Sequence, residues 1–426
     1  MVSASATIPA GYKQTEVGVI PEDWDISAID PLIDLLTGFP FPSSNFARIG
    51  IRLLRGANVK RGTLDWSENI TEYWPSASYG MQQFILQDGD IVVAMDGSLV
   101  GRSFAQISLE DTPVLLVQRV ARIRSKLIHI NFLKEWVCSR KFTIYCDSVK
   151  TVTAVPHISP LDIKSFKIAY PNNVREQEKI AKSLSDSESL IQALEKLISK
   201  KRDIKQGTMQ ELLTGKTRLP GFSGEWELKS IGEIAQVIGG GTPSTQVSHY
   251  WGGTINWFTP TEVGSTKYVF DSERKLTDSG LQNSSSSLLP IGAILLTSRA
   301  GIGDLGILCG RACTNQGFQS MVCNDKVNNE FLYYVMLTKR AELERRSSGS
   351  TFLEINPREL KSLLISLPQI NEQQAIAEVL SDMDAEITAL EQLLEKTKAI
   401  RQGMMQQLLT GRIRLVDPST PVEASA

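Results

Sequence analysis

An α+β fold of two similar globular lobes and two long helices is predicted by three observations. The chain of 426 residues contains one helix-like segment twice, its other residues repeat more weakly, and short apolar runs alternate with glycine and serine breakers. With 42% hydrophobic and 22% charged residues, the composition suits a globular protein of two or three domains, each able to bury a core.

The strongest repeat joins residues 176–219 to residues 372–415. The two segments align without a gap, more than half of their positions are identical, and they end in QGTMQELLTGKTRL and QGMMQQLLTGRIRL. Weaker pairing extends into the lobes, at 157–171 against 354–368, 89–101 against 292–304, and 20–29 against 222–231. The chain is therefore predicted to be two copies of one unit, each a variable lobe followed by a nearly invariant helix.

Each strongly repeated segment predicts one long amphipathic helix. It contains no proline before LLTG, where a glycine ends the helix. Apolar residues recur at spacings of three, four and seven, which places them in one seam. The seam residues expected to pair the helices are Ile180, Leu184, Ile191, Leu194, Ile198, Ile376, Leu380, Ile387, Leu390 and Leu394.

We expect the two seams to pack on each other as an antiparallel coiled coil with a lobe at each end. The unit then has an internal twofold repeat and a circular organisation, since the N-terminus would lie near the end of the second helix. Two independent amphipathic helices, each on its own lobe, are the alternative.

The lobes are predicted to be α+β domains. Strands are expected at Ile51–Leu54, Asp90–Met95, Pro113–Ile123 and Ala293–Ser298, and helices at Asn131–Phe142 and Glu330–Arg346. The predicted divisions are an N-terminal arm at 1–19, a first lobe at 20–171, a central helical region at 172–219, a second lobe at 220–368, a C-terminal helical region at 369–415 and a disordered tail at 416–426.

Signatures of catalysis are scarce in this chain. No GxxxxGK[ST] phosphate loop and no NPP[YF] methyltransferase motif occurs, so the sequence predicts no binding site for ATP or for a methyl donor. The five cysteines lack metal-finger spacing and fit buried thiols in a reducing cytoplasm, and no metal site is predicted. Neither a signal peptide nor a membrane-spanning segment is expected. Glu359-Leu360-Lys361 has a nuclease-like E-x-K spacing, but a surface helix explains it better.

Two divergent lobes on a rigid spacer, without a catalytic set, suggest a device that measures distance. DNA is a ligand for which fixed spacing matters, because half-sites recur with the turn of the double helix. The net charge of −2 does not by itself indicate nucleic-acid binding. It does not exclude such binding either, because a basic face can be balanced by acidic residues elsewhere.

The chain resembles the specificity subunits of Type I restriction–modification systems. The resemblance rests on the duplicated EQ-x-x-IA…LSD…ALE…LLTG segments, the GYKQTEVGVIPEDW start and GGGTPS…YWGG-x-I-W-x-TP, and it covers nearly the whole chain. It implies two target-recognition domains that read a split double-stranded DNA sequence, and helices that dock two methyltransferase subunits, with restriction–translocase subunits joining them. S-adenosylmethionine, ATP and magnesium would belong to those partners, and this chain would be no enzyme and hold no cofactor.

Candidate DNA-binding residues are the Arg, Lys, Asn, Gln and small polar residues of lobe loops, which are the types that contact base edges and phosphates. In the first lobe they are Arg55, Lys60, Arg61, Arg102, Lys150 and Thr151. In the second lobe they are Thr242, Ser244, Arg299, Asn315, Gln316, Ser348, Ser350 and Thr351.

Three other functions stay open from the residues alone. The first is a coiled-coil scaffold whose lobes bind proteins or small ligands without any DNA role. The second is a self-contained nuclease or methyltransferase, against which the missing motifs argue. The third is the recognition subunit of a related system that cuts on both sides of its site.

Overall fold

The computed structural model describes residues 8–299, 301–348 and 353–417. The chain divides into two compact units: unit 1 contains Met1–Leu194 and Leu393–Ala426, and unit 2 contains Glu195–Gln392. Each unit therefore holds one lobe together with one part of each long helix. The units are described separately.

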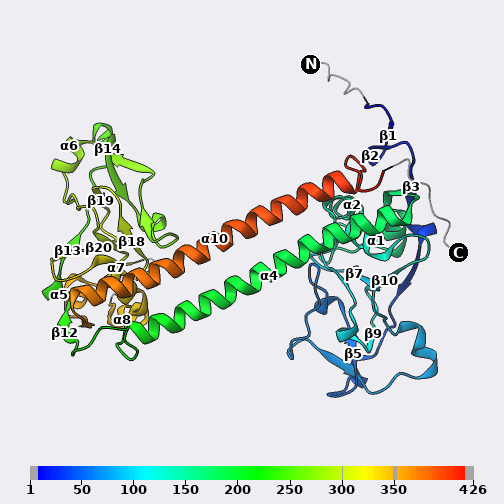
Figure 1. The fold of residues 1–426 in the computed structure, drawn as a ribbon, viewed down its shortest axis with the longest axis horizontal. Coiled ribbons are helices and arrows are strands. Elements are labelled where there is room, and N and C mark those ends of the chain that lie inside the picture. The colour runs from blue at the N-terminus through cyan, green and yellow to red at the C-terminus, as the bar shows by residue number, and fades with distance from the viewer. Residues whose placement is uncertain (1–7, 300, 349–352, 418–426) are drawn as a thin grey trace. The chain divides into compact units, whose positions relative to one another are not determined.

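The long helices are α4 (Val174–Leu212) and α10 (Ile370–Leu408), each of 39 residues. In unit 1, Arg401 of α10 forms an ion pair of 2.8 Å with Glu188 of α4. In unit 2, Lys201 of α4 lies 2.6 Å from Glu386 of α10. Within the same unit Lys205 pairs with Asp384, so partner numbers on α10 fall as those on α4 rise, and the two helices run antiparallel there (Figure 1). The predicted antiparallel pair is confirmed.

Most of the predicted seam residues are buried. Those buried are Ile180, Leu184, Ile191, Leu194, Ile198, Ile376, Leu380 and Ile387, whereas Leu390 and Leu394 are half-buried. Near the helix ends the seam also serves the lobes: Ile180 and Leu184 belong to the core of lobe one, and Ile376 and Leu380 to the core of lobe two. The same stripe thus joins helix to helix and helix to lobe.

Unit 1 contains a four-stranded antiparallel sheet, a smaller three-stranded sheet and two strand pairs. The four-stranded order is β4 (Ile33–Thr37), β10 (Val120–Ser125), β7 (Ile91–Ala94), β8 (Phe104–Gln106). The three-stranded order is β6 (Glu72–Trp74), β5 (Ile51–Leu54), β9 (Val114–Leu116). The pairs are β1 (Tyr12–Thr15) with β2 (Gly18–Pro21) and β3 (Trp24–Ala28) with β11 (Lys167–Pro171). The short helices are α1 (Ile130–Val137), α2 (Arg140–Val149) and α3 (Pro160–Ser165).

Unit 2 repeats this plan, but its larger sheet has one more strand and it has one strand pair in place of two. Its larger sheet has the order β13 (Ala235–Gly239), β20 (Gln319–Cys323), β17 (Ile294–Leu296), β18 (Leu305–Leu308), β15 (Tyr268–Val269). Its smaller sheet is β16 (Arg274–Leu276), β14 (Trp251–Phe258), β19 (Ala312–Thr314), and β12 (Glu227–Ser230) pairs with β21 (Leu364–Leu367). The short helices are α5 (Ile231–Ile234), α6 (Asp278–Gln282), α7 (Asn329–Thr338), α8 (Arg340–Arg346) and α9 (Pro357–Lys361). Glu359-Leu360-Lys361 thus lies on a short helix, as predicted.

Three sequence-based expectations about the lobe elements were wrong. The single strand expected at Pro113–Ile123 is two strands, β9 and β10, in different sheets, because Arg119 between them adopts a left-handed φ of 74°. The single helix expected at Asn131–Phe142 is broken into α1 and α2, since the Ser139 hydroxyl caps a new helix by accepting a bond from Phe142 N at 3.2 Å. The helix expected at Glu330–Arg346 breaks likewise into α7 and α8.

The repeated EQ pair that opens each long helix anchors it in its unit. Glu176, fully buried, accepts from Arg414 Nε at 2.5 Å, and Arg414 also forms two bonds to Asp23 at 2.8 and 2.9 Å. Gln177 accepts from the backbone N–H of His129 at 2.7 Å and donates to Pro171 O at 2.7 Å. The helix start is thereby tied both to the tail of α10 and to the lobe.

The second copy makes the same set of contacts inside unit 2. Each set, in which a buried Glu and Gln tie a long helix to its lobe, is called the helix–lobe joint, or joint. Glu372 accepts from Arg218 Nε at 2.5 Å, and Gln373 accepts from Asn328 N at 2.9 Å and donates to Pro368 O at 2.8 Å. The guanidinium groups stand over equivalent indole rings, Arg414 at 5.8 Å from Trp24 and Arg218 at 5.6 Å from Trp226. The EQ…R repeat is therefore explained by structure alone.

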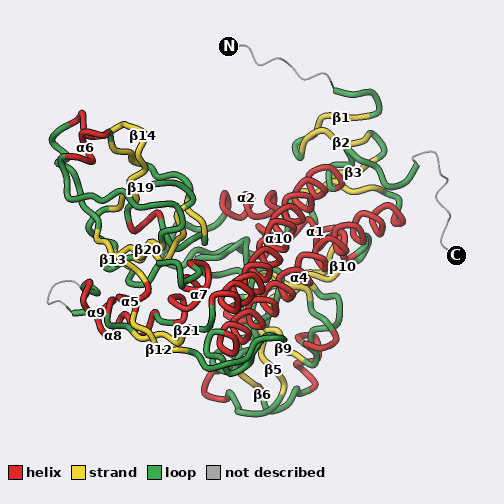
Figure 2. Tube along the Cα trace, turned by 60° about the vertical axis from the view of Figure 1, so that its left-hand side comes forward, coloured by secondary structure: helices red, strands yellow, loops and turns green. Residues whose placement is uncertain are grey.

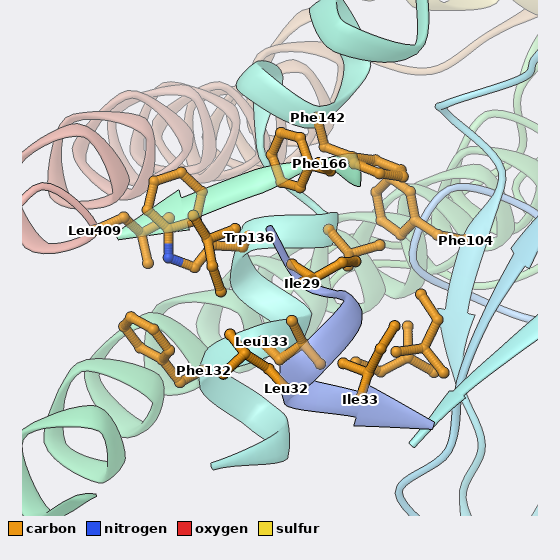
Figure 3. Close-up of a cluster of buried hydrophobic side chains, with 14 of the residues drawn as sticks. Ile29, Leu32, Ile33, Phe104, Phe132, Leu133, Trp136, Phe142, Phe166 and Leu409 are labelled. Atoms are coloured by element: carbon orange, nitrogen blue, oxygen red, sulfur yellow. The ribbon is translucent and has the colours of Figure 1, made fainter. Parts of the chain in front are cut away.

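The start of the chain closes onto the end of α10, within unit 1. Gly411 ends the helix with a left-handed φ of 65°, and a Cβ there would lie 2.5 Å from Pro21 Cγ, so only glycine fits. The Tyr12 hydroxyl donates to Gly411 O at 3.1 Å. Figure 2 shows β1 and β2 beside this helix end, and Figure 3 shows Leu409 among the lobe-one aromatic side chains Trp136 and Phe132. The predicted circular organisation is confirmed.

Candidate nucleic-acid interface

In lobe one, the predicted residues Lys60 and Arg61 lie beside the start of β8. Phe104 N donates to Lys60 O at 3.0 Å, and Gly62 N donates to Phe104 O at 2.7 Å. Lys60 is partly engaged with Asp65 at 3.6 Å, whereas Arg61 is exposed and has no side-chain partner among the described residues. Arg102 stands two residues before Phe104, so the two predicted loops meet.

Arg102 and Lys150 share one carboxylate. Arg102 forms a bidentate pair with Asp147 at 3.1 and 2.6 Å, and Lys150 Nζ donates to the same carboxylate at 2.6 Å. These two cations lower the pKa of Asp147 well below its usual range, and the hydrogen bond raises the pKa of Arg102. Asp147 therefore stays charged and holds both cations in place at the surface.

The remaining lobe-one residue of this region, Thr151, opens a closed loop. Thr151 N donates to His157 O at 2.9 Å, and the Thr151 hydroxyl accepts from His157 N at 3.0 Å. The His157 ring contacts Asp96, and Asp96 in turn forms an ion pair of 3.3 Å with Arg119. A chain of polar contacts thus runs beside the predicted residues.

Arg55, by contrast, is engaged inside lobe one. It donates to Ile70 O at 2.5 Å, lies 3.8 Å from Glu72 and stands over the Phe46 ring. Its backbone N–H donates to the Asn58 side chain at 3.1 Å, which caps a short turn. The structure therefore places Arg55 in a structural role as well as near the end of β5.

In lobe two, four predicted residues come together from three loops. The Thr242 hydroxyl donates to Gln316 Oε1. A Cβ on Gly240 would lie 2.0 Å from Asn315 O, so the glycine-rich GGGTPS loop packs directly on the TNQG loop. Arg299 is adjacent, since a Cβ on Gly317 would lie 3.5 Å from its Nε. Thr242, Gln316, Asn315 and Arg299 are the four residues of this cluster.

The other predicted residues of lobe two have different surroundings. Ser348 N donates to Glu354 O at 3.1 Å, and Glu354 accepts from the Ser298 hydroxyl at 3.2 Å, one residue before Arg299. Ser244 is exposed and its carbonyl accepts from the Trp251 indole at 3.2 Å. Ser350 and Thr351 lie outside the described residues.

The two clusters occupy equivalent backbone positions. In lobe one, Met95 N donates to Arg119 O at 2.9 Å and Ile158 N donates to Met95 O at 2.9 Å. In lobe two, Ser298 N donates to Gly317 O at 2.8 Å and Ile355 N donates to Ser298 O at 3.0 Å.

The side chains at these positions differ in charge. The equivalences are Asp96 with Arg299, His157 with Glu354, Arg119 with Gly317, and Gln118 with Gln316. An acid in one lobe thus stands where the other lobe has a base, on the same scaffold.

Several residues of lobe one were missed from the sequence. Asp96, Asp147 and His157 are acids or a histidine, which the search for base and phosphate contacts passed over, and Arg119 lay inside an expected strand. The repeat held a usable signal for Arg119 and Gln118, because they align with the predicted loop around Gln316.

Other chemistry has no visible seat in the described part of the chain. No group of three or more His, Cys, Asp or Glu side chains there could hold a metal ion. The five cysteines are free thiols, and burial raises the pKa of Cys146 and Cys323 to about 12. Among the described residues, no helix is long and apolar enough to cross a membrane.

Comparison with known proteins matches both halves of the chain. The model of the Type I restriction modification DNA specificity domain matches residues 21–202 and again 223–400. The Type I restriction enzyme MjaIX specificity subunit of Methanocaldococcus jannaschii is 43% identical over 164 residues, which are 38% of this chain and 38% of that protein. The putative type I restriction enzyme MjaX specificity subunit of the same organism is 24% identical over 95% of this chain and 97% of its own length.

A solved structure has the same fold. The S subunit of a Type I restriction–modification system from M. genitalium aligns with a TM-score of 0.60 at 14% identity, over 90% of this chain and 96% of that one. At that identity the match shows the fold, while the two family-model matches cover most of the sequence. The chain belongs to the family of Type I restriction–modification DNA specificity subunits, which recognise rather than catalyse.

Proposed function

We propose that each lobe reads one half of a split double-stranded DNA sequence and that α4 and α10 dock the subunits that act on this DNA. One observation carries the proposal: both lobes gather polar side chains at one backbone position, with different charges in each. A duplicated scaffold that varies at this surface suits a reader of two different half-sites.

The chemistry of the clusters supports a role in reading DNA. Exposed Arg61 and the Arg102–Lys150 pair offer cations for phosphates, and Arg can also bond guanine edges. Gln316 and Asn315 carry the amide groups that pair with adenine edges. Lobe one would rely more on cations and lobe two more on amides, so their half-sites should differ.

The helices supply the fixed spacing that a split target needs. Each 39-residue helix is about 58 Å long at 1.5 Å per residue. Ion pairs between α4 and α10 resist sliding of one helix along the other. We therefore assign the length of the non-specific spacer in the target to this helix pair.

The same helices offer surfaces for partner subunits. Both helices keep large apolar side chains exposed, namely Leu190, Leu197, Ile204, Leu393 and Ile400. Exposed apolar rows on long helices suit the packing of further helices. We assign them to two methyltransferase subunits, which would bring S-adenosylmethionine, with restriction–translocase subunits bringing ATP and magnesium. This activity would take place in the cytoplasm.

The test is to co-express the chain with the methyltransferase subunits and map methylated adenines across the host genome. We expect a motif of two short defined blocks around a fixed gap. Exchanging residues 20–170 for another lobe should change one block only, and inserting one helical turn in both α4 and α10 should change the gap only. A stable complex without methylation would instead favour a scaffold without a DNA role.

A further inference from the structure

Lobe one exposes two valines on the loop between α2 and α3. Val152 has a relative exposure of 103% and Val155 of 61%. Single exposed apolar side chains are ordinary on protein surfaces, so exposure alone says little. The shape of the loop and its surroundings distinguish this pair.

The loop is closed and braced by hydrogen bonds. Thr151 and His157 form two bonds across its base, at 2.9 and 3.0 Å. The Thr153 hydroxyl donates to Val155 O at 2.7 Å, and Gly97 N donates to Pro156 O at 2.9 Å. Valine is also stiff about its first side-chain torsion. The two side chains are therefore presented in advance, and little conformational entropy is lost when they meet a partner.

Cations surround the base of this loop. Lys150 precedes it directly and is held with Arg102 on Asp147. On the other side, His157 contacts Asp96, which pairs with the exposed Arg119. An apolar tip framed by cations complements a partner whose apolar groups lie between phosphates. DNA fits this description better than an apolar protein surface or a lipid tail.

The type of side chain favours one contact on DNA. Side chains that wedge between base pairs are Phe, Leu, Ile, Met or Pro, and valine is not among them. The 5-methyl group of thymine is the apolar feature of the major groove, where Ala, the methyl group of Thr and Phe contact it, and a valine methyl group offers the same contact.

We infer that Val152 and Val155 contact the 5-methyl group of a thymine in the half-site of lobe one. The inference rests on the proposed function, since it names what one part of the DNA-reading surface recognises.

The test uses the complex of the full chain with its methyltransferase subunits and the target found by methylation mapping. Each thymine in the lobe-one half-site is replaced singly by deoxyuridine, which lacks only the methyl group, and Kd is measured at one salt concentration. We expect one position to weaken binding about fourfold, the value of one buried methyl group. The double variant V152A/V155A should bind the natural duplex more weakly and show no further loss with deoxyuridine there.

Two controls separate a contact from a general defect. Leu109→Ala removes another exposed apolar side chain, 73% exposed, beyond the opposite end of β8 from Lys60, and it should keep the full deoxyuridine effect. V152T/V155T keeps the shape of both side chains and one methyl group of each, which can still contact the thymine methyl, so it should remain folded and keep part of the discrimination. Recognition of the lobe-two half-site should be unchanged in every variant.

The outcomes distinguish this inference from the proposed function. If every deoxyuridine duplex binds as the natural one, if the half-site contains no thymine, or if V152A/V155A keeps the discrimination, the inference is overturned. A split methylation motif would still support the proposed function in those cases. If the complex neither binds nor methylates a split motif, both fail together.

Discussion

The two lobes differ most where they are built most alike. Each lobe is tethered to a long helix through a buried Gln, and each closes one loop over the end of a strand of its larger sheet, β7 in lobe one and β17 in lobe two. At that place lobe one has Asp96 and His157, and lobe two has Arg299 and Glu354. The residues of the joint are buried and cannot change singly, whereas the exposed loop residues can vary with the ligand that each lobe binds.

Burial explains why the joint is repeated so closely. Glu176 and Glu372 are almost fully buried, and a buried carboxylate is costly unless a cation and hydrogen bonds satisfy it. Any change to one partner leaves the other unsatisfied, so the residues can only change together. The loop residues carry no such penalty, since Arg61, Arg119 and Gln316 are exposed.

The largest effect is expected from Arg414→Ala. The change leaves Glu176 buried without its cation, and removing one partner of such a pair costs about 3–5 kcal/mol. Hydrogen exchange of the β1–β2 amides, which lie on this joint, should become much faster. Arg218→Ala in unit 2 should act in the same direction but less strongly, because Arg218 lacks the second carboxylate that Asp23 gives to Arg414.

Lys182→Ala is the control for that comparison. Its side chain is 76% exposed and, among the described residues, pairs only with Asp186 one turn away, so removing it should leave exchange almost unchanged. Equal protection in Arg414→Ala and the parent protein would mean that the joint is not held by this ion pair.

The helices that form the joint could be predicted from the sequence, whereas the ion pairs and hydrogen bonds within it could not. Spacing of apolar residues locates both helices, because a helix repeats every 3.6 residues and the seam is local. The EQ and R positions are visible as repeated letters, but their pairing joins residues 238 apart, which no local pattern encodes. Arg119 shows the converse: β propensity predicted one strand, and a single left-handed residue split it between two sheets.

A second contrast concerns the position after mid-helix, where α10 carries Arg401 and α4 carries Lys205. Arg401 bonds the buried Glu135 of α1 at 2.9 Å, whereas Lys205 pairs with Asp384, which accepts from the Tyr334 hydroxyl at 2.6 Å. Burial raises the pKa of Glu135, and the positive charge of Arg401 opposes that rise. In Arg401→Met this pKa should therefore rise further.

The expected result is a pH-dependent loss of stability. A carboxyl whose folded pKa exceeds its unfolded value binds more protons when folded, so stability falls as pH rises through that interval. The free energy of unfolding of Arg401→Met, measured in urea, should match that of the parent at about pH 4.5 and be about 3 kcal/mol lower by pH 7. Adding Glu135→Gln should remove this pH dependence. The stability of Lys205→Met should depend less on pH, since Asp384 keeps its bond from the Tyr334 hydroxyl. An equally steep dependence would show that the two positions do not differ.

Removing the buried Gln at the start of either long helix should destabilise the two lobes equally. Gln177→Ala leaves His129 N and Pro171 O without partners, and Gln373→Ala does the same to Asn328 N and Pro368 O. Each should cost about 1–3 kcal/mol in urea unfolding, the range for stranded buried polar groups. Gln→Glu at either position keeps the shape but replaces the donor by a buried carboxylate beside Pro171 O or Pro368 O, so it should cost at least as much as the change to Ala. A large effect in one lobe and none in the other would show that only one of the two Gln residues stabilises its lobe.

The candidate site was only partly predictable from the sequence. Residue type picked Arg102 and Lys150, since base and phosphate contacts favour a few side chains. The carboxylate between them was not foreseeable, because an acid on a DNA-binding surface looks unfavourable until its partners are known. Asp147 orients two cations at once, which is a tertiary property.

The smallest effect is expected where this carboxylate is removed. The bonds Thr151 N–His157 O and Ser348 N–Glu354 O are equivalent, so Asp147 takes the place of Glu344 in lobe two, whose carboxylate lies 3.4 Å from Arg340. Asp147→Ser removes the lobe-one carboxylate. Loss of a negative charge near phosphates should raise the affinity for DNA without the target severalfold and steepen the salt dependence by about one phosphate contact. Affinity for the true target should gain less, because Arg102 and Lys150 lose their fixed geometry. Titrations on both duplexes at several salt concentrations measure the ratio, and the matching change Glu344→Ser in lobe two should shift non-target binding in the same direction. If Asp147→Ser instead left the ratio of the two affinities unaltered, the carboxylate would merely stabilise the fold, and its hold on Arg102 and Lys150 would have no part in specificity.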